Sequence, residues 1–435
     1  MKKIRIFGII AIFVILALCC FTSCNKDSGE TDTTTENVDN IVEEKALTFF
    51  ENGTSDFTLV RTDAEEDYYK TTLSALKNRL EAELETDFKI ATDWVNPNKP
   101  ADPSTHELLL GTTVRTESTD AANALTYSGY MIRVTDHKIV IIGSGLAQTT
   151  EAVKYFCDVM LRDTKYNKDG RIAFPVGLEI KKEMSDSEQL DVGTALLAGN
   201  DVGADMTKLF GRAGKNGFSI SQGAATDGEF VYIAMKKNTD GVETDRILKV
   251  DMKTWTVVLE SEELPLDHAN DMAFDTKGNR LVVTHMKDNL ISVIDPETLT
   301  VKETITLPFV SWGLAYIPSL NRFVFRGSGG GYSGIIFTDE NFNVVDNPAY
   351  ALDESGYTGQ GLDADDKYIY IPQSPDTIKN NRIMVCDLEG NVCGNIIINS
   401  TNEIETTFNF NGKYYANFNQ GGTTVYALEF YLKFE

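Results

Sequence analysis

The chain has 435 residues, 42% of them hydrophobic, and a formal net charge of −25 at pH 7. This length allows two or three domains, each with an ordinary core. So large an acidic excess argues against nucleic acid or an anionic membrane face as a partner. The sequence also lacks a GxxxxGKS/T phosphate loop, an HExxH zinc motif and paired CxxC motifs. We therefore expect neither a metal nor another cofactor.

The N-terminal residues predict the compartment. Basic residues at positions 2, 3 and 5 precede the apolar run Ile6–Leu18, which is too short for a membrane span. A serine and Cys24 follow, an arrangement that resembles the signal peptide of bacterial lipoproteins, with Phe21 in place of the usual leucine. The resemblance implies that residues 1–23 are removed and that Cys24 carries lipid. The protein is then extracytoplasmic and lipid-anchored in the bacterial cell membrane.

Residues 24–45 predict a disordered tether. The stretch NKDSGETDTTTENVDN holds a single apolar residue among many threonines and acids. Such a composition cannot bury enough apolar surface to offset the entropy of ordering the chain.

Residues 46–183 predict an α+β sandwich domain, because strand and helix patterns alternate along them. The expected strands are Leu47–Phe50, Thr58–Arg61, Lys89–Asp93, Leu108–Gly111, Tyr130–Val134 and Lys138–Ile142. The expected helices cover about residues 65–84, 118–125 and 148–161.

The stretch ELLLGTTVRTES, followed by YMIRVTDHKIVIIGSGLAQTTEAVKYFCDVML, has the order strand-glycine, loop, strand, turn, strand-glycine, helix. It resembles the small non-catalytic α+β domain that precedes the catalytic barrel in family 20 hexosaminidases and related α-glucuronidases. The resemblance implies an accessory domain. No catalytic barrel follows in this sequence, so no glycosidase active site carries over.

Residues 190–435 predict an all-β, five-bladed β-propeller. An apolar run, an aspartate, a short turn and a second apolar run recur at Asp251, Asp295, Asp339 and Asp387, in steps of 44, 44 and 48 residues. Four strand signals per unit at this period are typical of propeller blades. We expect each aspartate to bond its own turn backbone. The apolar segment Asp191–Ala198 is expected either to close the ring as an extra strand or to form an unrepeated hairpin.

The phrase VIDPETL, with ITLP after it, is similar to YVTN-type and quinoprotein-like propeller repeats. Those families include enzymes, binding proteins and scaffolds. The resemblance therefore implies a fold and leaves the function open.

Inner propeller strands start at one mouth of the central channel, so residues at a repeated offset should form a ring there. The aligned residues are Gln222, His268, Trp312, Gln360 and Glu405, with Asn270, Asp271 and Asp363 close by. An indole beside planar hydrogen-bonding groups suits a sugar or another small polar ligand. A polar mouth that is simply filled with water is the alternative.

A second polar set is expected where the second strands end. Its members are His285, Arg326, Gln373 and Asn417. Arg326 begins the sequence RGSGGGYSG, whose glycines suit either a lid over a ligand or a loose loop at a blade edge.

Three cysteines remain after the predicted cleavage. Cys157 lies on the apolar face of an expected helix and should be buried. Cys386 and Cys393 flank a hairpin. They would pair across a two-residue turn at Glu389-Gly390, but would be out of register if Asp387 begins a type I turn with a glycine bulge.

The sequence favours a binding protein for carbohydrate or another small polar ligand. The expected ligand-binding residues are Gln222, His268, Asn270, Trp312, Arg326, Gln360 and Glu405. One alternative is a surface scaffold that contacts other proteins. Another is a hydrolase or lyase acting on glycans through opposed carboxylates among Asp271, Asp363 and Glu405, although no motif assigns catalytic residues. We expect a monomer.

Overall fold

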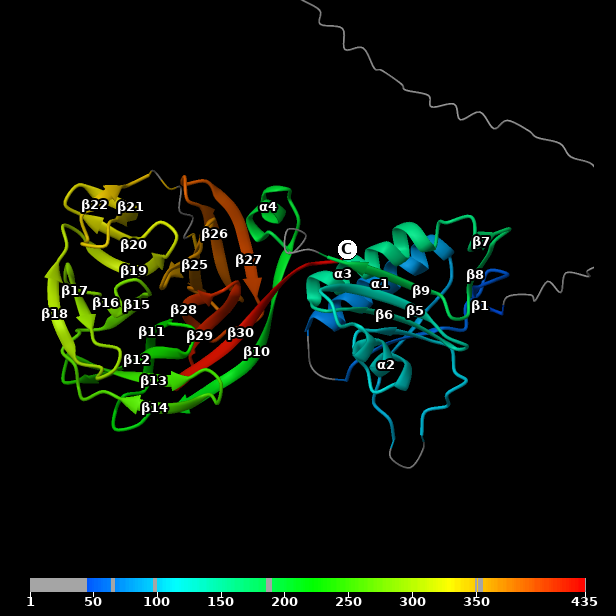
Figure 1. Cartoon of the computed structure of the whole chain (residues 1–435), viewed down its shortest axis with the longest axis horizontal. Helices are drawn as coiled ribbons and strands as arrows, with labels where there is room; N and C mark the ends of the chain where they lie inside the picture. Colours follow the sequence, from blue (N-terminus) through cyan, green and yellow to red (C-terminus); the bar gives the residue numbers. More distant parts are fainter. Residues whose placement is uncertain are drawn as a thin grey trace, which may run out of the picture. The chain divides into compact units, whose positions relative to one another are not determined.

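The computed structural model describes residues 45–63, 67–96, 100–184, 190–348, 350 and 355–434. The predicted signal peptide, Cys24 and the tether up to residue 44 lie outside these residues. The described residues are mostly β, with 52% in strands and 13% in helices (Figure 1). Among the described residues, no helix is both long and apolar enough to cross a membrane.

The first part of the chain builds a six-stranded mixed sheet in the order β3-β2-β4-β6-β5-β9. Its strands are β2 (Thr58–Arg61), β3 (Lys89–Thr92), β4 (Glu107–Leu110), β5 (Gly129–Val134), β6 (Lys138–Gly143) and β9 (Glu179–Glu183). The neighbours among β3, β2, β4 and β6 are parallel, whereas β5 is antiparallel to β6 and β9. A separate three-stranded sheet contains β1 (Ala46–Phe50), β7 (Asn167–Lys168) and β8 (Arg171–Pro175).

Three helices cover this mixed sheet. They are α1 (Asp67–Leu84), α2 (Thr116–Ala124) and α3 (Leu146–Tyr155), and α3 continues into the π-helical turn η1 (Phe156–Met160). Side chains alternate between the faces of β4: Leu108 and Leu110 share a core with α1 and α3, whereas Leu109 shares one with Ala121 of α2. The helices lie where the apolar spacing predicts them, with ends shifted by about two residues, and position 65 lies outside the described residues.

The β-rich part consists of three four-stranded antiparallel sheets and one nine-stranded sheet. The first sheet is β11 (Ile220–Thr226), β12 (Phe230–Thr239), β13 (Val242–Asp251) and β14 (Thr256–Glu260). The second is β15 (Ala269–Asp275), β16 (Arg280–His285), β17 (Leu290–Ile294) and β18 (Val301–Thr306). The third is β19 (Val310–Ile317), β20 (Arg322–Gly329), β21 (Tyr332–Thr338) and β22 (Val344–Asp346).

The nine-stranded sheet has two halves. One half holds β23 (Tyr357–Gly359), β24 (Asp363–Ala364), β25 (Tyr368–Pro375), β26 (Asn381–Asp387) and β27 (Val392–Ile398). The other holds β28 (Glu403–Phe410), β29 (Lys413–Asn419), β30 (Gly422–Leu432) and β10 (Val202–Ala213). The halves meet between β27 and β10, where only Gly203–Ile397 and Ala204–Ile398 pair.

The inner strands lie in a circle. β11 lies beside β15, β15 beside β19, β19 beside β24, β24 beside β28, and β28 beside β11. Figure 1 shows the sheets arranged around this common centre. The β-rich part is therefore propeller-like, as the repeat period predicts.

The closing strand is not the one expected from the sequence. The segment Asp191–Ala198 contains helix α4 (Val192–Leu197), whose first turn is capped by Asp191 accepting from the Thr194 N–H. The strand that completes the last sheet is β10, which pairs with β30 from Val202–Leu432 to Ala213–Gly422. The Asp–x–x–Thr cap therefore outweighs the apolar, strand-like composition of this segment.

The repeated aspartates have the structural role expected of them. Asp251 Oδ1 accepts from the N–H groups of Lys253 and Thr254, and Asp295 Oδ1 accepts from those of Glu297 and Thr298. The other two outer hairpins repeat this pattern, with Asp339 and Asp387 as acceptors. These carboxylates fix turns and are not available as a site.

The three cysteines that the structure describes, Cys157, Cys386 and Cys393, are free and buried. Cys386 pairs with Val392 rather than with Cys393, because the ladder shifts by one residue after a turn in which Gly390 has φ 102°. This is the bulged turn, one of the two geometries considered for this hairpin. It leaves the two thiols out of register, so no disulfide forms between them.

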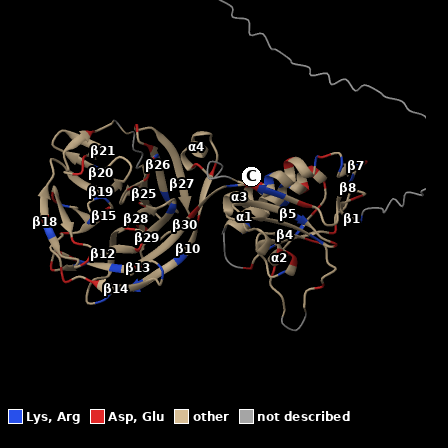
Figure 2. Ribbon diagram, viewed as in Figure 1, with Lys and Arg blue, Asp and Glu red and all other residues tan. Residues whose placement is uncertain are grey.

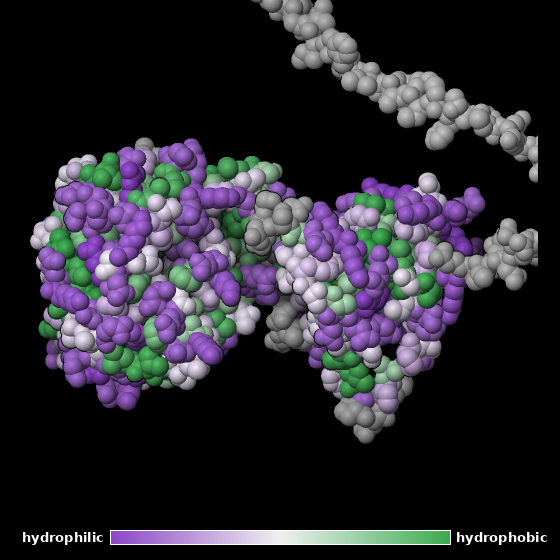
Figure 3. All heavy atoms as spheres, in the orientation of Figure 1, coloured by the Kyte–Doolittle hydropathy of each residue, from purple (hydrophilic) through white to green (hydrophobic). Residues whose placement is uncertain are grey.

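The surface agrees with the composition. Figure 2 shows acidic and basic residues interspersed over the sheets of the β-rich part. On the face drawn in Figure 3, hydrophilic residues predominate and apolar residues form small, scattered groups. Figure 2 shows no single-sign face of the kind that binds polyanions.

One carboxyl group fills the centre of the circle. Asp271 Oδ2 accepts from the N–H of Leu314 (2.8 Å) and of Leu362 (2.7 Å), and Oδ1 accepts from the Thr406 hydroxyl (2.9 Å). A residue of β15 is thereby bonded to three other inner strand segments. The positions equivalent to Asp271 are Gly223, Gly313, Gly361 and Thr406.

The glycines of this layer make room for Asp271. A Cβ at Gly361 would lie 2.9 Å from Asp271 Cγ, and a Cβ at Gly223 would lie 2.4 Å from Asp271 Cα. Both contacts are too close for any side chain. The central layer thus contains one acceptor group surrounded by donors.

We predict that Asp271→Ala lowers the free energy of unfolding by at least about 3 kcal/mol, because it leaves three buried donors without an acceptor. Asp271→Asn should lower it by about 1 kcal/mol or less. The asparagine Oδ1 can accept from both N–H groups, and its amide can donate to Thr406. Urea unfolding monitored by tryptophan fluorescence measures both. Equal losses in the two variants would contradict a role based on hydrogen-bond acceptance.

The stabilities of the native protein and of Asp271→Asn should also depend differently on pH. Burial raises the pKa of Asp271 to about 8, above the value of about 3.9 expected in the unfolded chain. Its contribution to stability is therefore fully present below pH 4 and is lost as the pH rises to 8. Asp271→Asn lacks this dependence, so its stability relative to the native protein should increase from pH 5 to pH 8.

Candidate functional site

Each inner strand carries a β-bulge at the same place. The ladder register shifts between Ser221 and Ala224 in β11, and at the matching positions of β15, β19 and β28. Between β23 and β24 the same extra residue occurs, because Gly359 pairs with Gln373 whereas Asp363 pairs with Tyr370. Bulges re-aim side chains and are frequent beside functional sites.

The bulged residues define the candidate site, which we name the bulge ring: Gln222, Asn270, Trp312, Gln360 and Glu405. Each of these residues comes directly before a residue of the central layer, which we name the Asp271 layer: Gly223, Asp271, Gly313, Gly361 and Thr406. Four of the five ring members are the residues expected from the sequence. At the remaining position the structure places Asn270, whereas the sequence alignment put His268 there.

Contacts run from one member of the ring to the next. Asn270 Nδ2 donates to the Trp312 carbonyl at 2.5 Å, and the Arg326 guanidinium lies 5.8 Å from the Trp312 ring. Arg326 also donates to the carbonyls of Gly359 (2.6 Å) and Gln360 (3.2 Å). Gln360 Nε2 donates to Glu403 Oε1 at 3.3 Å. Trp312 and Gln360 are half-buried, whereas the other ring members are buried.

Glu405 is the unusual member of the ring. Glu405 is only 5% exposed, and its Oε1 atom has no hydrogen-bond partner among the described residues. Burial raises the pKa of Glu405 well above its usual range, and the neighbouring Glu403 carboxylate raises it further. The shift favours the protonated acid, which can both donate and accept a hydrogen bond.

His268 lies two residues before Asn270, in a left-handed conformation with φ 69°. Its Nδ1 lies 3.1 Å from Lys236 Nζ and 3.3 Å from Glu243 Oε2. Burial and the Lys236 ammonium lower the pKa of His268, so its ring is neutral at pH 7. The imidazole thus belongs to an adjacent charged cluster.

The sequence analysis missed the other members of that cluster. Lys236 Nζ lies 3.5 Å from Glu243 Oε1, and Lys287 Nζ lies 2.8 Å from Glu243 Oε2. Burial raises the pKa of Glu243. The opposing effect of its three basic neighbours is larger and holds that pKa at about 2; these neighbours are Lys287, Lys236 and His268. Lys236 lies on β12, Glu243 on β13 and Lys287 in the turn after β16, where a sequence pattern indicates only solvated hairpins.

The second predicted polar set has structural roles. Asn417 Nδ2 donates to the Gln222 carbonyl at 2.7 Å, Gln373 Oε1 accepts from Arg382 Nε at 2.5 Å, and His285 Nε2 lies 2.9 Å from Ser292 Oγ. The glycines after Arg326 form a paired hairpin, with Gly327 opposite Gly334 and Gly329 opposite Tyr332. The segment is therefore a regular hairpin rather than the loose blade-edge loop that was one of the two alternatives, and the lid stays a prediction.

Among the described residues, no group of three or more His, Cys, Asp or Glu side chains could hold a metal ion. The bulge ring instead offers a hydrogen-bonding and stacking surface.

Comparison with known proteins gives likenesses in structure alone. No protein family matches the chain, and no curated protein is similar to it. A glutaminyl cyclase of Myxococcus xanthus is similar with a TM-score of 0.41 and 14% identity, over 54% of this chain and 98% of that chain. An exported protein of Bacteroides fragilis is similar with a TM-score of 0.33 and 7% identity, over 52% and 95%. The Swd1 β-propeller domain of Myceliophteria thermophila follows with a TM-score of 0.27 and 11% identity, over 49% and 65%.

We predict that Glu405→Gln raises the free energy of unfolding by about 1–2 kcal/mol at pH 8, because the carboxyl is ionised in the unfolded chain there and folding must either protonate it or bury its charge. At pH 4 the gain should vanish, since the acid is protonated in both states. Urea unfolding at the two pH values measures the difference. The exposed Glu262→Gln serves as the control and should show no such pH dependence. A loss of stability in Glu405→Gln at pH 8 would contradict the assignment.

Proposed function

We propose that this chain is an extracytoplasmic, lipid-anchored binding protein that holds a carbohydrate or another small polar ligand at one mouth of a five-bladed β-propeller. The observation that carries the proposal is the bulge ring. Five bulges at one register bring an indole, three amides and a buried carboxyl with one unpartnered oxygen into a single layer.

Several features support five blades. The nine-stranded sheet divides naturally at the two-pair contact between β27 and β10. Each half then has a four-strand ladder, so that five inner strands complete the circle. The helices on both faces of the first mixed sheet similarly support an α+β accessory domain like that of family 20 hexosaminidases.

The chemistry of the ring favours a hydroxylated ligand. A half-buried indole offers an apolar face to a sugar ring, while planar amides donate and accept at fixed angles. Glu405 in its acid form adds a donor without adding charge. Leaving Glu405 Oε1 unpaired in the free protein has a cost in stability that a ligand hydroxyl would remove.

The hydrolase alternative is weaker on this geometry. A glycosidase needs two carboxyl groups that face the same substrate. Asp271 is buried and its oxygens are engaged by three inner strand segments. It therefore serves the framework, and Glu405 has no partner carboxylate across the ring among the candidates from the sequence. A protein-interaction scaffold remains the outcome if no glycan binds.

We predict that Trp312→Ala weakens ligand binding at least about tenfold, since stacking on an aromatic face contributes roughly 1.4 kcal/mol or more. Trp312→Phe should retain most of the affinity. A screen on bacterial cell-wall and host glycans identifies the ligand, and titration calorimetry on the best hit measures the change.

The matched control is Trp94→Ala, which removes an indole that is 63% exposed in the first part of the chain. Affinity that drops equally in Trp94→Ala would place the site outside the bulge ring. The absence of binding to any glycan would favour the scaffold.

We predict that Cys24→Ser abolishes lipid attachment and releases the protein from the membrane fraction, because the thiol is the only acceptor in the lipoprotein-like signal. Labelling with radioactive palmitate in a bacterial host, followed by detergent phase partition, measures both effects. Cys20→Ser is the control and should leave labelling intact. Label that persists in Cys24→Ser would contradict the signal-peptide assignment.

A further inference from the structure

A separate cavity lies on the other side of the Asp271 layer. Its volume is about 950 Å³. Most of its lining residues follow that layer on the inner strands, for example Ala225, Ala273 and Ala315, or belong to the loop Asp365–Tyr368. The bulge ring precedes the same layer, so Asp271 stands between the two.

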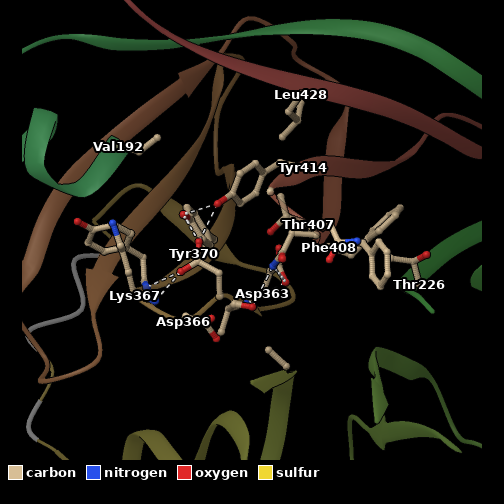
Figure 4. A pocket seen from close by; sticks show the side chains of 18 of the residues that line it. Val192, Thr226, Asp363, Asp366, Lys367, Tyr370, Thr407, Phe408, Tyr414 and Leu428 are labelled. Carbon is tan, nitrogen blue, oxygen red and sulfur yellow. Dashed lines mark hydrogen bonds between the residues drawn. The ribbon is translucent and has the colours of Figure 1, made fainter. Parts of the chain in front are cut away.

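Aromatic rings form much of the wall of this cavity. Tyr370 and Tyr414 line it with their ring centroids 5.2 Å apart, and Phe408 and Phe430 also line it. Asp365 Oδ2 accepts from the hydroxyl groups of Tyr370 (2.8 Å) and Tyr414 (2.7 Å), and Figure 4 shows these two tyrosines at the cavity. The tyrosines are therefore held in fixed orientations.

Two buried polar atoms in this wall have no hydrogen-bond partner among the described residues. They are Asp363 Oδ2 and Thr407 Oγ1. Asp363 is 8% exposed, and its other oxygen already accepts from Asn409 Nδ2 at 2.9 Å. Figure 4 shows both side chains at the cavity, and an unsatisfied carboxyl oxygen at a cavity wall implies a missing partner.

The charges of the lining indicate the sign of that partner. The described lining contains five acids, Asp191, Asp363, Asp365, Asp366 and Glu429. Lys367 is the single base there, and its Nζ lies 2.8 Å from Asp191 Oδ2. No cation in the described wall is left for an anionic ligand, whereas aromatic faces beside a carboxylate attract organic cations.

We infer that this cavity binds an organic ammonium ion, with Asp363 as its counter-ion and the rings of Tyr370, Tyr414 and Phe408 around it. The site is distinct from the bulge ring and does not rest on the function proposed for it.

Binding should be linked to the titration of Asp363. Burial, together with the Asp365 carboxylate, raises the pKa of Asp363 to about 7. Three other side chains near Asp363 are neutral: Asn409 of β28, Tyr370 of β25 and Tyr414 of β29. The nearby Lys367 is paired with Asp191. On binding, the Asp363 acid releases its proton to solvent and forms an ion pair with the ammonium group. Below pH 7 the affinity should therefore fall roughly tenfold per pH unit.

The test is titration calorimetry of the purified chain with choline and with 3,3-dimethylbutan-1-ol, in which a carbon atom replaces the nitrogen. We expect choline to bind at least tenfold more tightly than the neutral alcohol at pH 8. The affinity for choline should fall roughly 30-fold by pH 5.5. Proton release should appear as a heat that depends on the ionisation enthalpy of the buffer.

Two variants separate Asp363 from the general acidity of the cavity. Asp363→Asn should lose at least tenfold in affinity for choline at pH 8, together with its pH dependence, while a thermal melt verifies folding. Asp366→Asn removes an exposed carboxylate from the same lining and should change the affinity less than threefold. Equal binding of choline and the alcohol, no binding of choline, or equal losses in both variants would each overturn the inference.

Discussion

The hydrogen bonds of Asp271 are the constraint on which the β-rich part depends. A ring of sheets places the edges of its inner strands together at the centre, where unpaired backbone N–H groups have no sheet neighbour and little water. One carboxyl with two oxygens satisfies donors from three strand segments at once. The glycines around it follow from the space that this group needs.

That arrangement also divides the centre of the molecule into two environments. On one side lies the bulge ring, where the bulges turn the side chains and the groups are three amides, an indole and a carboxyl. Residues after the Asp271 layer are small or aromatic and surround an acidic cavity. Among the described residues, buried carboxyl oxygens without a partner occur on both sides, on Glu405 before the layer and on Asp363 after it. Sites that bind ligands often retain such unsatisfied groups, at some cost in stability.

The sequence predicts the repeat well because the turn aspartates recur at nearly constant steps, and their chemistry is local. In most inner strands the ring residue is followed by a small residue, as in Gln222-Gly223 and Trp312-Gly313. In β15 Asp271 takes the place of that small residue, and the same pattern of a large residue before a small one occurs two positions earlier, at His268-Ala269. The alignment therefore selected His268 in place of Asn270. The acidic cavity could not be predicted, because Asp363, Thr407 and Tyr414 come together only through tertiary packing.

The pairing of β10 with β30 has a consequence for how the molecule is made. Gly203 and Tyr431 are partners in one ladder, although the whole β-rich part separates them along the chain. Joining two segments so far apart costs roughly 5 kcal/mol of chain entropy, and nothing repays this cost until the last strand is available. A chain emerging from its amino end must therefore wait with one strand edge of β10 uncovered, and this exposed edge is the state most open to aggregation and to chaperones. Because pairing of β30 with β10 closes the ring, damage in a peripheral loop should be tolerated better than the loss of a few residues of β30.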